Sequence, residues 1–253
     1  MLKRYFGKTD QGPLLKINED GMLIEPFLSL YGVIDAFGGV AIGDEFVKFL
    51  KDEIIKGFSS HLSDPDKTLS YFFDPLRPVE VNGLFNLILE LNKKSLELNS
   101  KKNFFQRAGA SLLIALQVEE TLHVFSVGVS QMWLLRKKQV IPICKSNAIQ
   151  KYEPKAPERF KIDTSSQHII PKTALGLNLN LEISWNPCRI LEGDLFFLAS
   201  TGVLLDGDLI SLLTSIPERT SQTPPLQIMV DRALEYSNSK GNIDNQTLLL
   251  LEY

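Results

Sequence analysis

Acidic residues beside apolar runs are the candidates for chemistry in this sequence. Glu19 and Asp20 stand in INEDG, Asp35 stands in VIDAFGG, and Asp244 stands in NIDNQT. Each follows or precedes an apolar run, so each carboxylate could project from a sheet edge toward a shared point. Oxygen-rich clusters of this type suit hard divalent cations such as Mg²⁺ or Mn²⁺. Taken singly, each residue also has a simple reading as part of a turn, because Asn, Asp and Gly are turn formers.

The elements that must position these residues follow from the hydrophobic pattern. Alternating or continuous apolar runs predict strands, and apolar residues at helical spacing predict helices. The predicted strands are 12–26 (two strands around a turn at 18–21), 29–35, 108–118, 122–129, 130–143, 188–200 (two strands around a turn at 192–194) and 247–253. The predicted helices are 44–58, 81–102 with Asn82 as its N-cap, 206–216 and 224–239. Residues 144–172 are polar and contain proline, which predicts an irregular surface segment.

This order of elements favours one fold class. Strands come in clusters that suit antiparallel pairing, and helices come mostly in pairs, which favours an α+β sandwich over an alternating βαβ array. We find no linker-like tract and expect a single domain over residues 1–253.

Composition narrows the classes of function. The formal net charge is −3, so no basic footprint indicates nucleic-acid binding. The chain has no apolar run of transmembrane length, so we expect no membrane association. The two cysteines form no disulfide framework, which together with these features predicts a cytoplasmic protein.

Seven sequence blocks, in one order, carry a family resemblance. They read INEDGML, YGVIDAFGG, AGASLLIAL, LHVFSVGVSQMWLL, KTALG, LEGDLFFLASTGVL and GNIDNQTLLLL, and they span nearly the whole chain. The sequence thereby resembles the metal-dependent protein phosphatases of the PPM type, also called type 2C. In that family the blocks read NED, DGxGG, GTT, VGDSR, TRALG, GDxxLLxSDG and DN-T.

The resemblance implies a four-layer α-β-β-α sandwich, with two antiparallel sheets flanked by helix pairs. It also implies a two-metal centre at one end of the sandwich. In the family, two Mn²⁺ or Mg²⁺ ions activate a bridging water that attacks phosphoserine or phosphothreonine. The ions offset phosphate charge and lower the pKa of that water.

Part of the family's metal-binding set is present in this sequence. Asp35 matches the bridging aspartate, and Ala36 replaces the glycine that offers a backbone carbonyl. Glu19 and Asp20 match the acidic pair of the first motif, and Asp244 matches the final metal-binding aspartate. Alanine retains the carbonyl, so its presence matters only if the position requires a positive φ. The resemblance therefore implies a metal set of Asp35, Ala36, Glu19 and Asp244, with Mn²⁺ or Mg²⁺ as the cofactor.

Other family positions are degenerate. Thr201 stands where the SDG motif has its metal-binding aspartate, and Val129 and Gln131 stand where GDSR has its Asp and Arg. Leu15 stands where the first motif has the arginine that binds substrate phosphate. Lys16 is adjacent, but neighbours on a strand point to opposite faces, so it is a poor substitute.

These losses affect a core metal ligand, an accessory metal ligand and the phosphate clamp. We therefore predict a pseudophosphatase that acts as a protein-binding or regulatory module in signalling, with a protein partner, in one form a phosphoprotein. Its incomplete site would hold fewer than two Mn²⁺ or Mg²⁺ ions, or none. The alternative is an active Mn- or Mg-dependent serine/threonine phosphatase with a reduced metal set. A third possibility is a false resemblance and a soluble α+β domain only. Residues 145–172 are either a plain surface loop or a partner-binding element.

Overall fold

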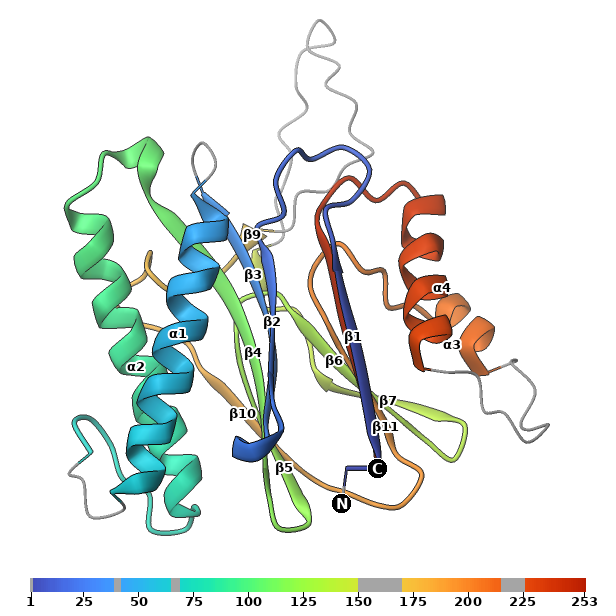
Figure 1. The fold of residues 1–253 in the computed structure, drawn as a ribbon, viewed down its shortest axis with the longest axis horizontal. Coiled ribbons are helices and arrows are strands. Elements are labelled where there is room, and N and C mark those ends of the chain that lie inside the picture. The colour runs from blue at the N-terminus through green and yellow to red at the C-terminus, as the bar shows by residue number, and fades with distance from the viewer. Residues whose placement is uncertain (1, 39–41, 65–68, 150–169, 215–225) are drawn as a thin grey trace, which may run out of the picture.

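A computed structural model describes residues 2–38, 42–64, 69–149, 170–214 and 226–253. Two five-stranded antiparallel sheets lie face to face between helices (Figure 1). Sheet A contains, in spatial order, β1 (Arg4–Asp10), β12 (Gln246–Glu252), β11 (Leu195–Ala199), β6 (Gln131–Arg136) and β7 (Gln139–Cys144). Sheet B contains β10 (Ser184–Arg189), β5 (Thr121–Val127), β4 (Ala108–Val118), β3 (Leu30–Gly38) and β2 (Asp20–Glu25). A short third pair joins β8 (Ala148–Ile149) to β9 (Ile170–Pro171).

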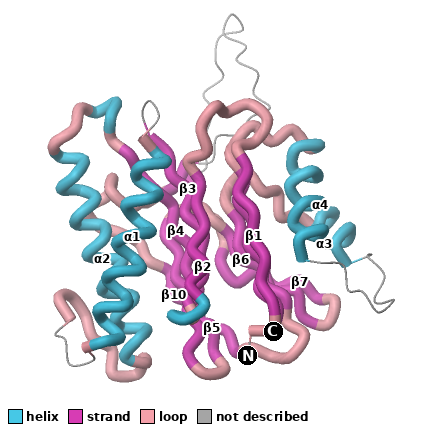
Figure 2. Tube along the Cα trace, viewed as in Figure 1, coloured by secondary structure: helices cyan, strands magenta, loops and turns pink. Residues whose placement is uncertain are grey.

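Helices form the two outer layers (Figure 2). The helices α1 (Gly43–Ser63) and α2 (Val79–Ser100) cover sheet B, and α3 (Gly207–Thr214) and α4 (Leu226–Ser239) cover sheet A. Two short 3₁₀ helices, η1 (Pro26–Leu28) and η2 (Phe104–Gln106), lie in connections. The predicted α+β class and the α-β-β-α order of layers are confirmed.

Three apolar clusters fill the spaces between the layers. One lies between α1, α2 and sheet B and includes Leu50, Leu84 and Ile114. The second lies between the sheets and includes Val33 and Leu249, and the third lies under α3 and α4. The continuous apolar run of β12 fits this arrangement, because Leu249 and Leu251 face the inter-sheet cluster while Leu248 and Leu250 face the helices.

The N-terminal prediction is wrong in its first strand. The predicted hairpin over 12–26 is replaced by β1 at Arg4–Asp10, a loop over residues 11–19, and β2. Gly12 has a φ of +76°, which turns the chain out of β1. Asn245 then holds the loop, because its Nδ2 donates to the carbonyls of Gln11 (2.8 Å) and Ile17 (3.0 Å).

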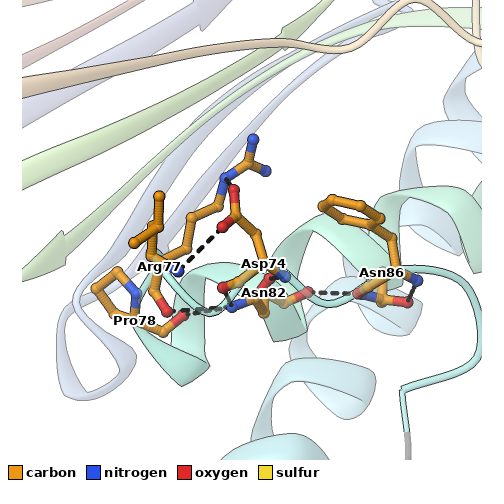
Figure 3. A network of polar contacts seen from close by, with 7 residues as sticks. Asp74, Arg77, Pro78, Asn82 and Asn86 are labelled. Carbon is orange, nitrogen blue, oxygen red and sulfur yellow. Dashed lines mark hydrogen bonds and ion pairs between the residues drawn. The ribbon is translucent and has the colours of Figure 1, made fainter.

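The predicted N-cap of α2 is also wrong, because the helix begins at Val79 after Pro78. Asn82 lies inside the first turns, and its side chain organises the preceding loop (Figure 3). Its Oδ1 accepts from the Asp74 N–H at 2.9 Å. Its Nδ2 lies within 3.2 Å of the carbonyls of Asp74, Arg77 and Pro78.

Two further predictions concern the strands over 188–200 and the polar segment over 145–172. The second strand predicted over 188–200 is β11, but the first lies mostly earlier, as β10 at Ser184–Arg189. β10 pairs with β5, whereas β11 pairs with β6 and β12, so the segment between them connects the two sheets. Most of the polar segment 145–172 lies outside the described residues. Within the described part of the chain, no helix combines the length and hydropathy that a transmembrane span requires.

Candidate metal centre

The candidate centre lies where the ends of four strands from both sheets meet. Asp20 on β2 and Asp35 on β3 are directly opposite each other in the sheet B ladder. Thr201 follows β11 and Asp244 precedes β12, and these neighbouring strands belong to sheet A. The sandwich thus brings together carboxylates that lie far apart in the sequence.

Thr201 binds Asp35 through two donors. The Oδ2 atom of Asp35 accepts from the Thr201 N–H at 3.0 Å and from its Oγ1 at 2.7 Å. The Oγ1 atom also lies 3.3 Å from Oδ2 of Asp244. Because a hydroxyl carries one proton, it donates to one carboxylate at a time, and the shorter distance favours Asp35.

The protonation of Asp35 reflects this environment. Burial raises the pKa of Asp35 to about 6, the hydrogen bonds from Thr201 oppose the rise, and the negative charge of Asp244 adds to it. Thr201 therefore stabilises the ionised form of a carboxyl that its surroundings would otherwise protonate.

Asp20 is held in the same manner by the adjacent residue. Its Oδ2 accepts from Oγ of Ser200 at 2.7 Å, and that Oγ accepts from the Thr247 N–H at 2.9 Å. Burial, followed by the negative charge of Asp35, raises the pKa of Asp20 well above its ordinary value. Ser200 and Thr201 thus link sheet A to two carboxylates of sheet B.

Glu19 has a structural partner at the start of α1. Its Oε1 accepts from the Gly43 N–H at 2.8 Å, while the N-cap residue Ile42 contributes no side-chain hydrogen bond. Burial raises the pKa of Glu19, and the Gly43 N–H opposes that rise. A Cβ at Gly43 would lie 2.5 Å from Oε1, so this contact requires glycine. Glu19 therefore acts as the cap of α1, because a carboxylate at a helix N-terminus is favourable.

Ala36 keeps an ordinary strand conformation. Its N–H donates to the Glu19 carbonyl at 3.1 Å, and its φ is not positive. Replacement of the family's glycine at this position therefore causes no backbone strain.

The degenerate positions have their own partners. Val129 is buried, and its N–H donates to Oγ of Ser111, which lies opposite Asp35 on β4. Gln131 opens β6 and accepts from the Trp133 Nε1 at 3.3 Å.

Leu15 and Lys16 lie in the loop over 11–19 and not on a strand, so the argument from opposite strand faces does not apply to Lys16. The Leu15 side chain is 39% exposed. The loop itself is tied to the centre by Asn245, whose Oδ1 accepts from the Glu19 N–H at 2.9 Å. Sequence reasoning missed the roles of Asn245 and Ser200, although both stand inside matched blocks, DNQT and LASTG.

The donor set does not fit a two-metal centre. Two dications close together need several ionised carboxylates and open oxygen lone pairs. Thr201 brings no charge and donates twice to Asp35, and Glu19 is engaged at α1. Among the described residues, no three His, Cys, Asp or Glu side chains form a group that could hold a metal ion.

Comparisons with known proteins identify the fold. No protein-family model matches the chain, and no curated protein matches it. Solved structures do match it. The PPM Ser-Thr phosphatase MsPP from Mycobacterium smegmatis, in complex with cacodylate, has a TM-score of 0.69 at 20% identity, over 99% of this chain and 98% of that one.

Two further structures agree. PppA from Pseudomonas aeruginosa has a TM-score of 0.71 at 21% identity, over 98% of this chain and 96% of that one. The catalytic domain of the serine/threonine phosphatase PstP, in complex with two manganese ions, has a TM-score of 0.66 at 20% identity, over 98% of this chain and 97% of that one. The chain therefore has the fold of the PPM serine/threonine phosphatases.

Proposed function

We propose that this protein is a pseudophosphatase, a PPM-type fold that serves as a protein-binding or regulatory module and holds its centre together without metal ions. The observation that carries the proposal is the pair of hydrogen bonds from Thr201 to Oδ2 of Asp35. They place neutral donors where a metal ion would need an open lone pair of that carboxylate.

Two other features support the proposal. Glu19 is engaged at the N-terminus of α1, so its use as a metal ligand would cost the helix its cap. Leu15, at the position of the family's phosphate-binding arginine, is an apolar side chain that offers nothing to a phosphate. The partner in this proposal is a protein, in one form a phosphoprotein recognised without turnover. We place it in the cytoplasm because Cys144 and Cys188 are free thiols.

The alternative is an active phosphatase with a reduced set of Mn²⁺ or Mg²⁺ ligands. The observation in its favour is the gathering of Asp20, Asp35 and Asp244 at one end of the sandwich. The negative charge of Asp244 raises the pKa of both other carboxyls, a repulsion that a bound dication would relieve.

Calorimetry and a turnover assay separate the two functions. Mn²⁺ is titrated into the protein, and hydrolysis of a phosphoserine peptide is measured at millimolar Mn²⁺. We expect no saturable binding and no turnover. Turnover that disappears in Asp35→Asn would refute the pseudophosphatase proposal. Thr201→Asp is the matched positive control, because it restores a carboxylate at the position of the missing ligand.

A further inference from the structure

Within the described part of the chain, one edge of sheet B has no partner strand. β2 is the last of the described strands in this sheet and pairs only with β3 among them. The Ala36 N–H donates to the Glu19 carbonyl, so Glu19 and every second residue after it in β2 turn their backbone groups toward β3. In an antiparallel pair every second residue turns its N–H and C=O to the other side. Met22 and Ile24 therefore direct their backbone groups away from β3. Asp20, two residues before Met22, follows the same alternation: its N–H does not pair with β3 but donates to Oδ1 of Asn18.

The outward groups of Met22 and Ile24 are available for pairing. Neither residue has a backbone hydrogen bond to any described residue outside β3. An unpaired edge of this kind is a template for another strand, and proteins use it to bind extended peptides.

A groove of about 500 Å³ runs along this edge, between β2 and α1. The helix packs closely on the strand at Gly21, where an added Cβ would lie 2.3 Å from Cγ1 of Val47. The groove reaches from Glu25 at one end of β2 to Asp20 at the other. A chain bound in it would therefore end beside the candidate centre.

Charged side chains of α1 form one wall of the groove, which is lined by Asp44, Lys48, Lys51 and Asp52. Asp44, Lys48 and Asp52 are exposed, whereas Lys51 is half-buried and its Cδ lies over Gly21. None of the three forms an ion pair with another described residue. Residues four apart on a helix are about 6 Å apart along its axis. Alternate residues of a strand are separated by about 6.7 Å, a similar distance.

We propose that the free edge of β2 binds an extended segment of a partner protein as an added strand, with basic, acidic and basic side chains on alternate residues. These side chains would face Asp44, Lys48 and Asp52 in turn. The pattern reads the same in either chain direction, so it holds for parallel or antiparallel addition. This inference rests on the proposed function, since it gives the binding module its partner chemistry.

The test uses two fluorescein-labelled peptides without phosphate, measured by fluorescence anisotropy in metal-free buffer. One has the core Lys-Thr-Glu-Thr-Lys and the other has the inverted core Glu-Thr-Lys-Thr-Glu. We expect the first to bind about tenfold more tightly, since three exposed charge pairs change from attractive to repulsive. In Lys48→Glu the preference should move to a peptide with the core Lys-Thr-Lys-Thr-Lys. Lys56→Glu is the matched control, because Lys56 is exposed on α1 outside the groove.

A backbone variant tests strand addition itself. Ile24→Pro removes an outward N–H and leaves the ladder to β3 intact, a position at which edge strands tolerate proline. It should lose peptide binding, whereas Ile24→Ala, which loses the same packing, should keep it. The proposal is overturned if the two variants bind alike, if both peptides bind equally, or if neither binds. Metal binding or turnover would refute the proposed function and leave these outcomes unaffected.

Discussion

Thr201→Val removes one hydrogen bond at the centre and little else. Valine has nearly the shape of threonine, and the bond from the backbone N–H to Asp35 remains. The lost bond, from Oγ1 to Oδ2 at 2.7 Å, has a charged acceptor when Asp35 is ionised. Such bonds contribute about 1.5–3 kcal/mol, so we expect the free energy of unfolding to fall by about 2 kcal/mol at pH 8. For a chain of this size the Tm should fall by about 4–8 °C.

The pH dependence distinguishes this cause from a general loss of packing. The pKa of Asp35 is raised to about 6, so below that pH the carboxyl becomes neutral in the folded protein. A neutral hydrogen bond contributes about 1 kcal/mol, so the difference between wild type and Thr201→Val should be roughly halved at pH 5.

Urea unfolding at pH 8 and pH 5 measures both quantities. Thr201→Ser keeps the hydroxyl and should remain close to the wild type. The reasoning is refuted if Thr201→Val is as stable as the wild type at pH 8, or if Thr201→Ser loses as much as Thr201→Val.

Two more predictions concern the centre, and a third concerns the loop before α2. Thr201→Asp should lower the Tm in metal-free buffer, because it adds a carboxylate beside Asp35 and Asp244. Millimolar Mn²⁺ should restore the Tm of this variant. No effect of Mn²⁺ would show that position 201 does not match the family's ligand. The pKa of Asp35 is higher in the folded state than in the unfolded state, so the folded state keeps this proton to a higher pH. From pH 4 to pH 7 the free energy of unfolding of the wild type should therefore fall by up to about 3 kcal/mol relative to that of Asp35→Asn, measured by urea unfolding. Parallel pH profiles of the two proteins would contradict this. Asn82→Ala should cost about 2–3 kcal/mol, because it leaves the Asp74 N–H and nearby carbonyls without their partner, and hydrogen exchange should quicken in residues 70–78.

Local sequence pattern was sufficient to predict most elements. Continuous apolar runs marked β4 and β5, which are buried along most of their length on both faces. The helical spacing of Phe46, Leu50 and Ile54 marked α1, because it reports burial on one face of a helix. The order of layers followed from the resemblance, which rests on many short blocks and not on any single one.

The errors arose where long-range contacts decide local structure. The loop over 11–19 is fixed by Asn245, more than 200 residues away in sequence, and no local pattern reports that bond. Asn82 is of a residue type that often caps helices, but α2 begins earlier, at Val79 directly after Pro78. Glu19 matched a metal-binding motif, but its partner at Gly43 depends on how α1 meets β2.

The pairing of β1 has a consequence for how the protein folds. Among the described strands, β1 pairs only with β12, and their register joins Arg4 to Glu252. β12 lies between β1 and β11, so β1 joins sheet A only after β12 has been synthesised. Such non-local pairing raises contact order and slows folding. On the ribosome, β1 would therefore remain an unpaired strand until β12 has emerged, and an unpaired strand is a site for aggregation.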